Sequence, residues 1–216
     1  MFLSYLVTCH NESDSLHDLL VKLYESLKPT HEVVIIDDYS DSPVTLSILE
    51  EYQKKERVVI QKHKLDNHYG AHKNFGIEQC KGDWIFQLDA DELPTDTLIN
   101  NIDVILENNS HNEVLWLPRL NYFVGVTQKD VDDWGWKLYD GLINFPDFQS
   151  RLFRNLPYIR YHRRLHEKVE GQKTYAFIPP QKDIAIIHNK TIEKQRENNQ
   201  NYMNTFTKQE NMGFQV

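Results

Sequence analysis

The segment WIFQLDADE, residues 84–92, joins a run of apolar and aromatic side chains to three carboxylates. Residues 84–88 have the length and composition of a strand that is buried in a sheet. Asp89, Asp91 and Glu92 follow at once, so their carboxylates are expected where the strand ends. Two carboxylates one residue apart at such a position can bind one hard cation, because Mg²⁺ and Mn²⁺ prefer oxygen ligands. An isolated Asp-x-Asp is also typical of a solvated turn before a helix, so the surrounding pattern has to decide.

Apolar runs alternate with helical patterns through the first half of the chain. Strands are predicted at residues 2–7, 32–36, 57–60, 84–88 and 113–117. Helices are predicted between them at residues 14–27, 44–52, 71–80 and 95–106. Strands separated by helices of this length indicate an α/β fold with a mostly parallel sheet and helices on both faces. Ligands of such sheets bind beyond the carboxyl ends of the strands, which is where the acidic cluster is expected.

The second half of the chain lacks this alternation. Residues 121–148 mix aromatic residues with Gly and Asp without a clear period, which predicts loops and short strands over the open side of the sheet. A further strand is predicted at residues 183–188, and a polar helix at residues 191–209. The chain then divides into a first half, a second half of the same domain and a helical tail, at residues 1–120, 121–190 and 191–216.

Composition restricts the class of protein. The chain has 216 residues with 40% hydrophobic and 26% charged residues, which is typical of a globular protein. The net charge of −8 argues against a general nucleic-acid coat protein. Two cysteines form no disulfide framework, which favours a reducing compartment. No signal peptide and no run of about 18 apolar residues is found, so we expect a soluble, cytoplasmic protein without a transmembrane segment.

Polar residues also follow the first two predicted strands. Residues 8–12, TCHNE, follow the first strand, and residues 37–40, DDYS, follow the second. The carboxyl ends of parallel strands meet at one edge of a sheet, so we expect both segments to share a cleft with the acidic cluster. Each segment also has a purely structural interpretation, as an N-cap for the first and an Asx-turn for the second.

Together these segments resemble glycosyltransferase family 2, whose members have the GT-A fold, a Rossmann-like α/β sheet. The resemblance covers residues 1–120 and rests on TCHNE, DDYS, QLDADE at residues 87–92 and GAHKNFG at residues 70–76. It implies that the first half binds a nucleotide-sugar, with a UDP-linked sugar as the expected donor.

The resemblance also implies roles for individual residues. It places seven residues around the donor: Thr8, His10, Asn11, Glu12, Asp38, Asp89 and Ala90. His72 and Lys73 stand where an arginine is frequent in the family, and they are expected to bind the diphosphate of the donor, with a solvent-facing position as the alternative. It implies that Asp91 binds Mn²⁺ or Mg²⁺ as the cofactor. His188 ends the late predicted strand, where proteins of this fold often place a metal-binding histidine, although a lone histidine is as often structural.

The second half resembles a soluble branch of the family, similar to lipopolysaccharide-type sugar transferases, through PDFQSRLF at residues 146–153 and LHE at residues 165–167. In inverting members an acid from this region deprotonates the acceptor hydroxyl. Asp147 is the preferred candidate for this base over Glu167, and an ion pair with Arg151 is the structural alternative for Asp147. Nearby cationic and imidazole side chains are expected to bind the acceptor: Arg151, Arg163, Arg164 and His166.

The sequence therefore predicts a metal-dependent, inverting glycosyltransferase that moves a sugar from a nucleotide-sugar to an acceptor hydroxyl, with a saccharide as the expected acceptor. Residues 151–168 carry six Lys or Arg residues against one acid, with aromatic residues interleaved. That stretch leaves open a second acceptor class, a modified base of viral DNA. A third hypothesis, of another class, is a non-catalytic nucleotide-binding protein on the same fold. The sequence points to no particular oligomeric state.

Overall fold

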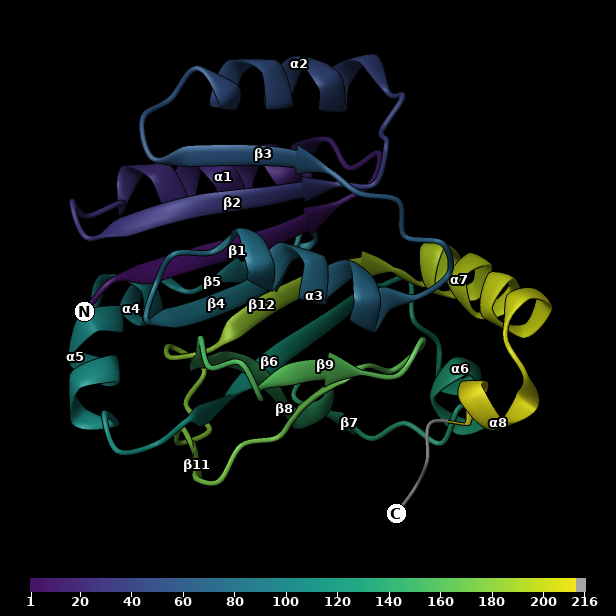
Figure 1. Ribbon diagram of the computed structural model, residues 1–216. Coiled ribbons are helices and arrows are strands. Elements are labelled where there is room, and N and C mark those ends of the chain that lie inside the picture. The colour runs from purple at the N-terminus through teal and green to yellow at the C-terminus, as the bar shows by residue number, and fades with distance from the viewer. Residues whose placement is uncertain (213–216) are drawn as a thin grey trace.

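The apolar runs of the first half form a parallel sheet, as the alternating pattern predicts. The computed structural model describes residues 1–212, and its first strands are β1 (Leu3–Cys9), β2 (His31–Asp37), β3 (Val58–Lys62) and β4 (Trp84–Asp89). They lie in the order β3-β2-β1-β4, and every neighbouring pair is parallel. All residues of β1 and β2 are buried, which explains why their central residues, 5–7 and 33–36, are continuous apolar runs. The four carboxyl ends consequently point to one edge (Figure 1).

The strands after β4 extend the same sheet. They are β5 (Glu92–Pro94), β6 (Val114–Val124), β7 (Leu138–Tyr139), β8 (Leu142–Arg154), β11 (Tyr175–Phe177) and β12 (Ile186–Thr191). The order continues β4-β8-β6-β12-β5, with β8 antiparallel to both of its neighbours. β12 is parallel to β6 and antiparallel to β5, while β11 pairs with β6 and β7 with β8. β9 (Arg160–His162) and β10 (Lys168–Glu170) form a separate antiparallel pair.

The prediction of loops and short strands at residues 121–148 holds for the middle of the range, where β7 has two residues, but was wrong for the two ends and for the helix at Gln128–Asp133. That range contains the end of β6 and the first half of β8, which is 13 residues long. Pro146 stands inside β8, and a proline in a run normally argues against a central strand. The pairing of β6 with β8 also shifts register twice, between Leu115 and Leu117 and between Arg119 and Asn121. These irregularities break the alternation by which a strand is recognised.

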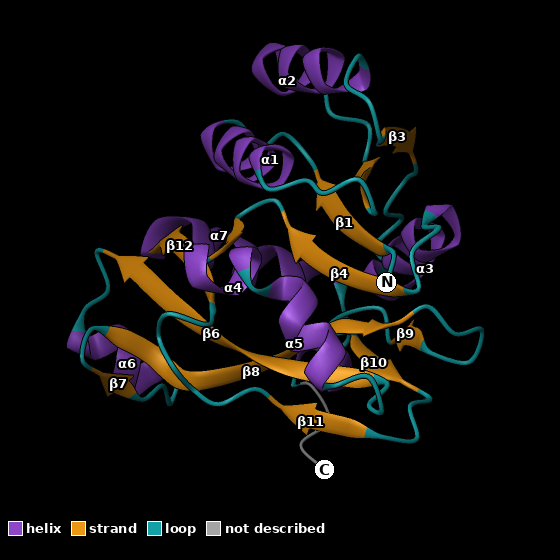
Figure 2. Cartoon of the chain, turned by 90° about the vertical axis from the view of Figure 1, so that its left-hand side faces the viewer, coloured by secondary structure: helices purple, strands orange, loops and turns teal. Residues whose placement is uncertain are grey.

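Helices cover both faces of the sheet, as predicted. α1 (Asp14–Glu25), α2 (Pro43–Gln53), α4 (Asp96–Asn100) and α5 (Ile102–Asn108) share one core with Leu3, Tyr5 and Val7 of β1. α3 (Tyr69–Gln79), together with β9 and β10, packs on the opposite face against Leu6. Figure 2 shows α1 and α3 on opposite sides of β1 and β4. The single helix predicted at residues 95–106 is two helices, which meet at Asn101.

The C-terminal part adds α6 (Gln128–Asp133), α7 (Ile192–Thr205) and α8 (Lys208–Asn211). The helix predicted at residues 191–209 ends at Thr205, and Thr207 begins α8 with a capping box to Glu210. Residues 213–216 of the predicted tail lie outside the described residues. α7 and α8 lie on the side toward which β2 and β3 point (Figure 1). Within residues 1–212, no helix has the length and apolarity that a membrane crossing requires.

Gly76 offers a test of how α3 packs on the sheet. A Cβ at this position would lie 2.6 Å from Leu6 Cδ1 and 3.0 Å from Ile36 Cγ1. In an exposed helix, alanine is about 1 kcal/mol more favourable than glycine. Overpacking a core costs about 1–3 kcal/mol, so we expect Gly76→Ala to lower the unfolding free energy despite the better helix propensity. Urea unfolding measures the change, and Glu78→Ala at an exposed position of α3 is the control. A midpoint raised by Gly76→Ala would show that α3 does not pack this closely.

Candidate active site

The carboxyl ends of β1, β2 and β4 open into a cleft of about 720 Å³. The structure brings most of the predicted site residues together there. The predicted donor contacts that line the cleft are Thr8, His10, Asn11, Glu12, Asp38, His72, Lys73, Asp89 and Ala90. The other predicted residues that line it are Asp91, Arg151, His166, Glu167 and His188. Asp147, Arg163 and Arg164 are outside this lining.

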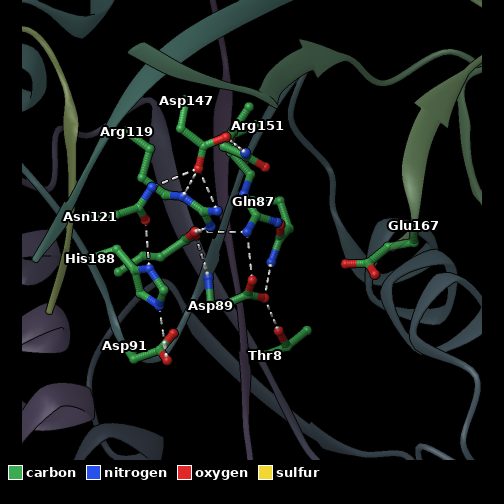
Figure 3. A network of polar contacts seen from close by, with 12 residues as sticks. Thr8, Gln87, Asp89, Asp91, Arg119, Asn121, Asp147, Arg151, Glu167 and His188 are labelled. Atoms are coloured by element: carbon green, nitrogen blue, oxygen red, sulfur yellow. Dashed lines mark hydrogen bonds and ion pairs between the residues drawn. The ribbon is translucent and has the colours of Figure 1, made fainter. Parts of the chain in front are cut away.

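Asp89 is surrounded by donors at the end of β4. Its carboxylate accepts hydrogen bonds from Thr8 Oγ1 at 3.0 Å, Gln87 Nε2 at 2.9 Å and Arg151 Nη2 at 2.6 Å (Figure 3). Lys73 Nζ lies 3.0 Å from Asp89 Oδ1. Burial alone would raise the pKa of Asp89, but Arg151 and Lys73 hold it well below its usual range. Asp89 is therefore a fixed, neutralised anion in the floor of the cleft.

Arg151 lies below the cleft surface in this network. Its side chain is only 7% exposed, and Nη2 also donates to Glu92 Oε1 at 2.8 Å while Nη1 donates to Gln87. Asp89 is its third partner. The sequence predicted an acceptor contact for Arg151, which stays untested. In the structure, the guanidinium of Arg151 neutralises the carboxylates of Asp89 and Glu92.

Asp147 is held by a different arginine from the one predicted. Arg119 donates to Asp147 Oδ2 from Nε at 3.0 Å and from Nη2 at 2.7 Å, so the ion pair forms with Arg119 and not with Arg151. Asn121 Nδ2 donates to the same oxygen at 2.8 Å, and Gln149 Nε2 donates to Oδ1 at 2.8 Å. Burial works to raise the pKa of Asp147, but these neighbours lower it. Both oxygens are thus occupied by donors within the protein.

Asp91 and His188 face each other across the cleft. His188 Nε2 lies 3.4 Å from Asp91 Oδ2, and its other nitrogen, Nδ1, lies 2.8 Å from Asn121 Oδ1. Burial would raise the pKa of Asp91, but the hydrogen bond and charge of His188 lower it to about 2. Within the described part of the chain, no three His, Cys, Asp or Glu side chains converge as a metal site. A cation here would have one carboxylate and one imidazole from the protein.

Lys73 connects Asp89 to Glu167. Its Nζ donates to Glu167 Oε1 at 2.6 Å, and its side chain is 3% exposed. Burial and Arg151 would lower the pKa of Lys73, but Asp89 and Glu167 raise it, so it stays charged. Glu167 reaches the cleft from the loop between β9 and β10. Figure 3 shows it apart from the network around Asp147.

His72 is buried and contributes no charge at neutral pH. Burial and the neighbouring His63 lower its pKa to about 4. The two Nδ1 atoms lie 3.1 Å apart, and His63 stacks on Phe75 with ring centroids 4.2 Å apart. The solvent-facing alternative for His72 is excluded by its burial, and a neutral imidazole can contribute only a hydrogen bond to a diphosphate. Its neighbour His68 caps α3 by accepting a hydrogen bond from Ala71 N.

The basic stretch that suggested a nucleic-acid acceptor is tied to other parts of the protein. Arg164 Nη1 lies 3.2 Å from Glu210 Oε1, and Arg163 Nη2 lies 3.8 Å from Glu170 Oε1. His166 Nε2 lies 3.2 Å from the backbone oxygen of Asn211. These contacts place α8 against the loop that carries Glu167.

Several cleft residues were missed by sequence reasoning. They come from β6, β8, β12 and α7: Arg119, Gln149, Lys190, Lys194, Gln195, Asn198 and Tyr202. Lys190 had a usable signal, because it lies two residues after His188 on a strand and therefore on the same face, and Gln149 stands inside the quoted segment PDFQSRLF. The position of Arg119 depends on the pairing of β6 with β8, which the pattern did not reveal. The positions of the α7 residues depend on how α7 packs on the sheet, which the local sequence does not show.

Comparisons with known proteins agree with this geometry. Among curated proteins, the chain is 34% identical over 95 residues to an undecaprenyl-phosphate 4-deoxy-4-formamido-L-arabinose transferase of Pseudomonas fluorescens, which covers 42% of this chain and 28% of that protein. It is 30% identical over 94 residues to a poly-beta-1,6-N-acetyl-D-glucosamine synthase of Staphylococcus epidermidis, with coverages of 44% and 23%. The chain thus spans about a quarter of the length of these relatives.

The fold is similar to that of a solved structure, S. aureus TarS 1–349 in complex with UDP-GlcNAc. The TM-score is 0.61 at 17% identity, over 88% of this chain and 58% of that one. This similarity confirms the predicted fold class, a GT-A type α/β sheet. The profile of one family, glycosyl transferase family 2, matches residues 4–170, from β1 through β10. The chain therefore belongs to glycosyl transferase family 2.

Proposed function

We propose that the protein is an inverting, metal-dependent glycosyltransferase that moves a sugar from a uridine diphosphate sugar to a saccharide hydroxyl. The observation that carries this proposal is a single cleft at the ends of β1, β2 and β4. Asp91, His188 and Glu167 all line this cleft. Its volume of about 720 Å³ lies in the range of small-molecule sites. The S. aureus TarS complex, with UDP-GlcNAc on a similar fold, supports the choice of donor.

The residues present fit a divalent cation. Asp91 Oδ2 and His188 Nε2 are 3.4 Å apart, so both can contact one ion, and the remaining ligands would be diphosphate oxygens and water. An imidazole ligand favours Mn²⁺ over Mg²⁺, which prefers an all-oxygen shell. When bound, such an ion would neutralise negative charge that builds up on the departing diphosphate.

Lys190 is the side chain best placed to assist the same leaving group. It lines the cleft beside His188, and burial lowers the pKa of its amine although Asp91 raises it. An anionic ligand stabilises a half-buried ammonium, because the negative charge of the ligand compensates for the hydration that burial removes. Lys190 would therefore hold the diphosphate oxygens from the β12 side.

We assign the general base to Glu167 in place of Asp147. Glu167 lines the cleft, and Lys73 contacts only one of its two oxygens, Oε1, among the contacts described for residues 1–212. Asp147 lies outside the lining, and both of its oxygens accept hydrogen bonds from the protein. A base must come within hydrogen-bond reach of the hydroxyl that it deprotonates, and the position of Glu167 in the cleft lining supports this role. The acceptor oxygen would then attack the anomeric carbon as the bond to the diphosphate breaks.

A saccharide acceptor is favoured by the surface next to His188. Phe123 lies edge-on to His188 with centroids 6.1 Å apart and packs on Trp136 at 4.8 Å, and Trp134 packs on Trp136 at 4.6 Å. Aromatic rings offer flat apolar faces to sugar rings, while the hydroxyl groups at the edges of the sugar stay hydrated. The name of one curated relative, a poly-beta-1,6-N-acetyl-D-glucosamine synthase, describes a polysaccharide product, whereas the name of the other gives undecaprenyl phosphate.

Ligand-induced stabilisation tests the donor and metal together. A ligand at 100 times its dissociation constant stabilises the native state by about 2.7 kcal/mol, which is about 5–10 °C for a chain of this size. We expect a UDP-sugar with Mn²⁺ to raise the Tm by this amount, and Asp91→Ala to remove the part that depends on Mn²⁺. Thermal-shift measurements with UDP-, GDP-, ADP- and CMP-sugars check both.

No shift with any of these donors would contradict the proposal. A shift without release of UDP from the donor, in the presence of saccharide acceptors, would instead favour a non-catalytic nucleotide-binding protein.

Glu167→Gln tests the base. The amide keeps the shape of the side chain but cannot take a proton, so we expect kcat to fall by about 10²–10⁴ while the Kd for the donor stays within a few-fold. Glu170→Gln, the same change on the exposed edge of β10, is the control. Assays of UDP release give kcat, and titration calorimetry gives the Kd. An unchanged kcat for Glu167→Gln would show that Glu167 is not the base and would favour Asp147.

A further inference from the structure

A chain of hydrogen bonds connects Arg119 to His188, and each link fixes the next. The acceptor that sets the direction of these bonds is Asp147. An ionised carboxylate has no hydrogen to donate, so it can only accept hydrogen bonds. Arg119 donates to it twice, at 3.0 and 2.7 Å, and so keeps it ionised. The side chain of Asn121 lies 2.8 Å from the same oxygen, Oδ2. Only the amide nitrogen of Asn121 can donate there, so the orientation of this amide follows from chemistry.

The orientation of Asn121 determines the protonation of the His188 ring. With Nδ2 turned to Asp147, the amide oxygen Oδ1 must face His188 Nδ1, at 2.8 Å. An amide oxygen is an acceptor only, so Nδ1 must carry the hydrogen. In the neutral ring, Nε2 then carries the lone pair, and it points at Asp91 Oδ2 from 3.4 Å. Two electron-rich atoms then face each other, and either a second proton on Nε2 or a metal cation between them satisfies this arrangement.

We propose that Arg119, Asp147 and Asn121 form a positioning relay that holds His188 as the Nδ1-protonated ring, with Nε2 free to bind a divalent cation beside Asp91. This inference rests on the proposed metal dependence and gives Asp147 a role other than that of the base. Outer hydrogen bonds of this kind fix the ring nitrogen and orientation of metal-binding histidines in general.

The relay is built into the register of the sheet. Arg119 on β6 is directly opposite Asp147 on β8, and His188 on β12 is directly opposite Asn121 on β6. Arg119 and Asn121 are two residues apart and so project from the same face of β6. Three neighbouring strands therefore hold the polar groups in line, and Asn121 and His188 are both buried. A rigid sheet gives the ring little freedom to turn away.

The tautomer of His188 can be measured without metal. We expect ¹⁵N NMR of the metal-free protein, at a pH where the ring is neutral, to show the hydrogen on Nδ1. Asn121→Ala should release this preference. Asn189→Ala, the same change at the exposed residue after His188, should leave it in place. Hydrogen on Nε2 in the unaltered protein would overturn the relay, whatever its affinity for manganese.

Manganese affinity gives the second measurement. Loss of an outer hydrogen bond typically weakens metal binding 10–100-fold. We therefore expect the Kd for Mn²⁺, measured by electron paramagnetic resonance with UDP present, to rise about 10-fold or more in Asn121→Ala and in Asp147→Asn. The affinity for UDP without metal should stay within about two-fold, as a test that the cleft is intact. Asp147→Asn keeps the volume of the side chain and serves where Asn121→Ala does not fold.

The outcomes separate the relay from the proposed function. If Asp91→Ala abolishes Mn²⁺ binding but Asn121→Ala and Asp147→Asn retain the original Kd, the relay is overturned and the metal proposal stands. If the unaltered protein binds no Mn²⁺ with UDP present, the metal proposal fails, and the cation-binding role of the relay fails with it. If Asp147→Asn lowers kcat without any change in the Kd for Mn²⁺, Asp147 is the base and not a positioning residue.

Discussion

Buried carboxylates at the edge of the sheet have to be neutralised, and this constraint shapes the rest of the site. Glu92 is 1% exposed, and Asp89 sits beside it at the end of β4. A buried ion pair that loses one partner costs about 3–5 kcal/mol, so cations must reach both residues. Arg151 supplies the charge from β8, which runs antiparallel between β4 and β6. The insertion of β8 thus joins the two halves of the chain through charge as well as through backbone pairing.

The same constraint divides by role the carboxylates that line the cleft and Asp147 outside its lining. Asp89 is balanced by Lys73 and Arg151, and Asp147 is balanced by Arg119. Asp91 has no such guanidinium or ammonium within ion-pair distance among the contacts described for residues 1–212, and it faces the imidazole of His188 instead. An incoming cation would therefore meet, in Asp91, a carboxylate whose ion-pair partner among the described residues is an imidazole and not a permanent cation.

Sequence patterns predicted the parallel strands and the acidic cluster because both depend on neighbours in the chain. The apolar run before Asp89 is enough to place that carboxylate at a strand end. The partner of Asp147 is a different case, since Arg119 lies 28 residues away and meets it only through the register of β6 and β8. Pro146 and two register shifts conceal that register. The sequence therefore offered Arg151, four residues from Asp147, as the nearest visible partner.

The C-terminal helices show a further limit of local patterns. The polar sequence of α7 has little apolar face, and by itself it predicts an appendage. In the structure, Lys194 donates to Glu12 after β1, and Tyr202 lines the cleft. The ties from α8 to Arg164 and His166 then hold the loop that ends in Glu167. A polar helix can serve a site through the charged side chains that it places there. This role produces no hydrophobic periodicity in the helix sequence, and the residues that α7 and α8 contact are more than 30 positions away in the chain.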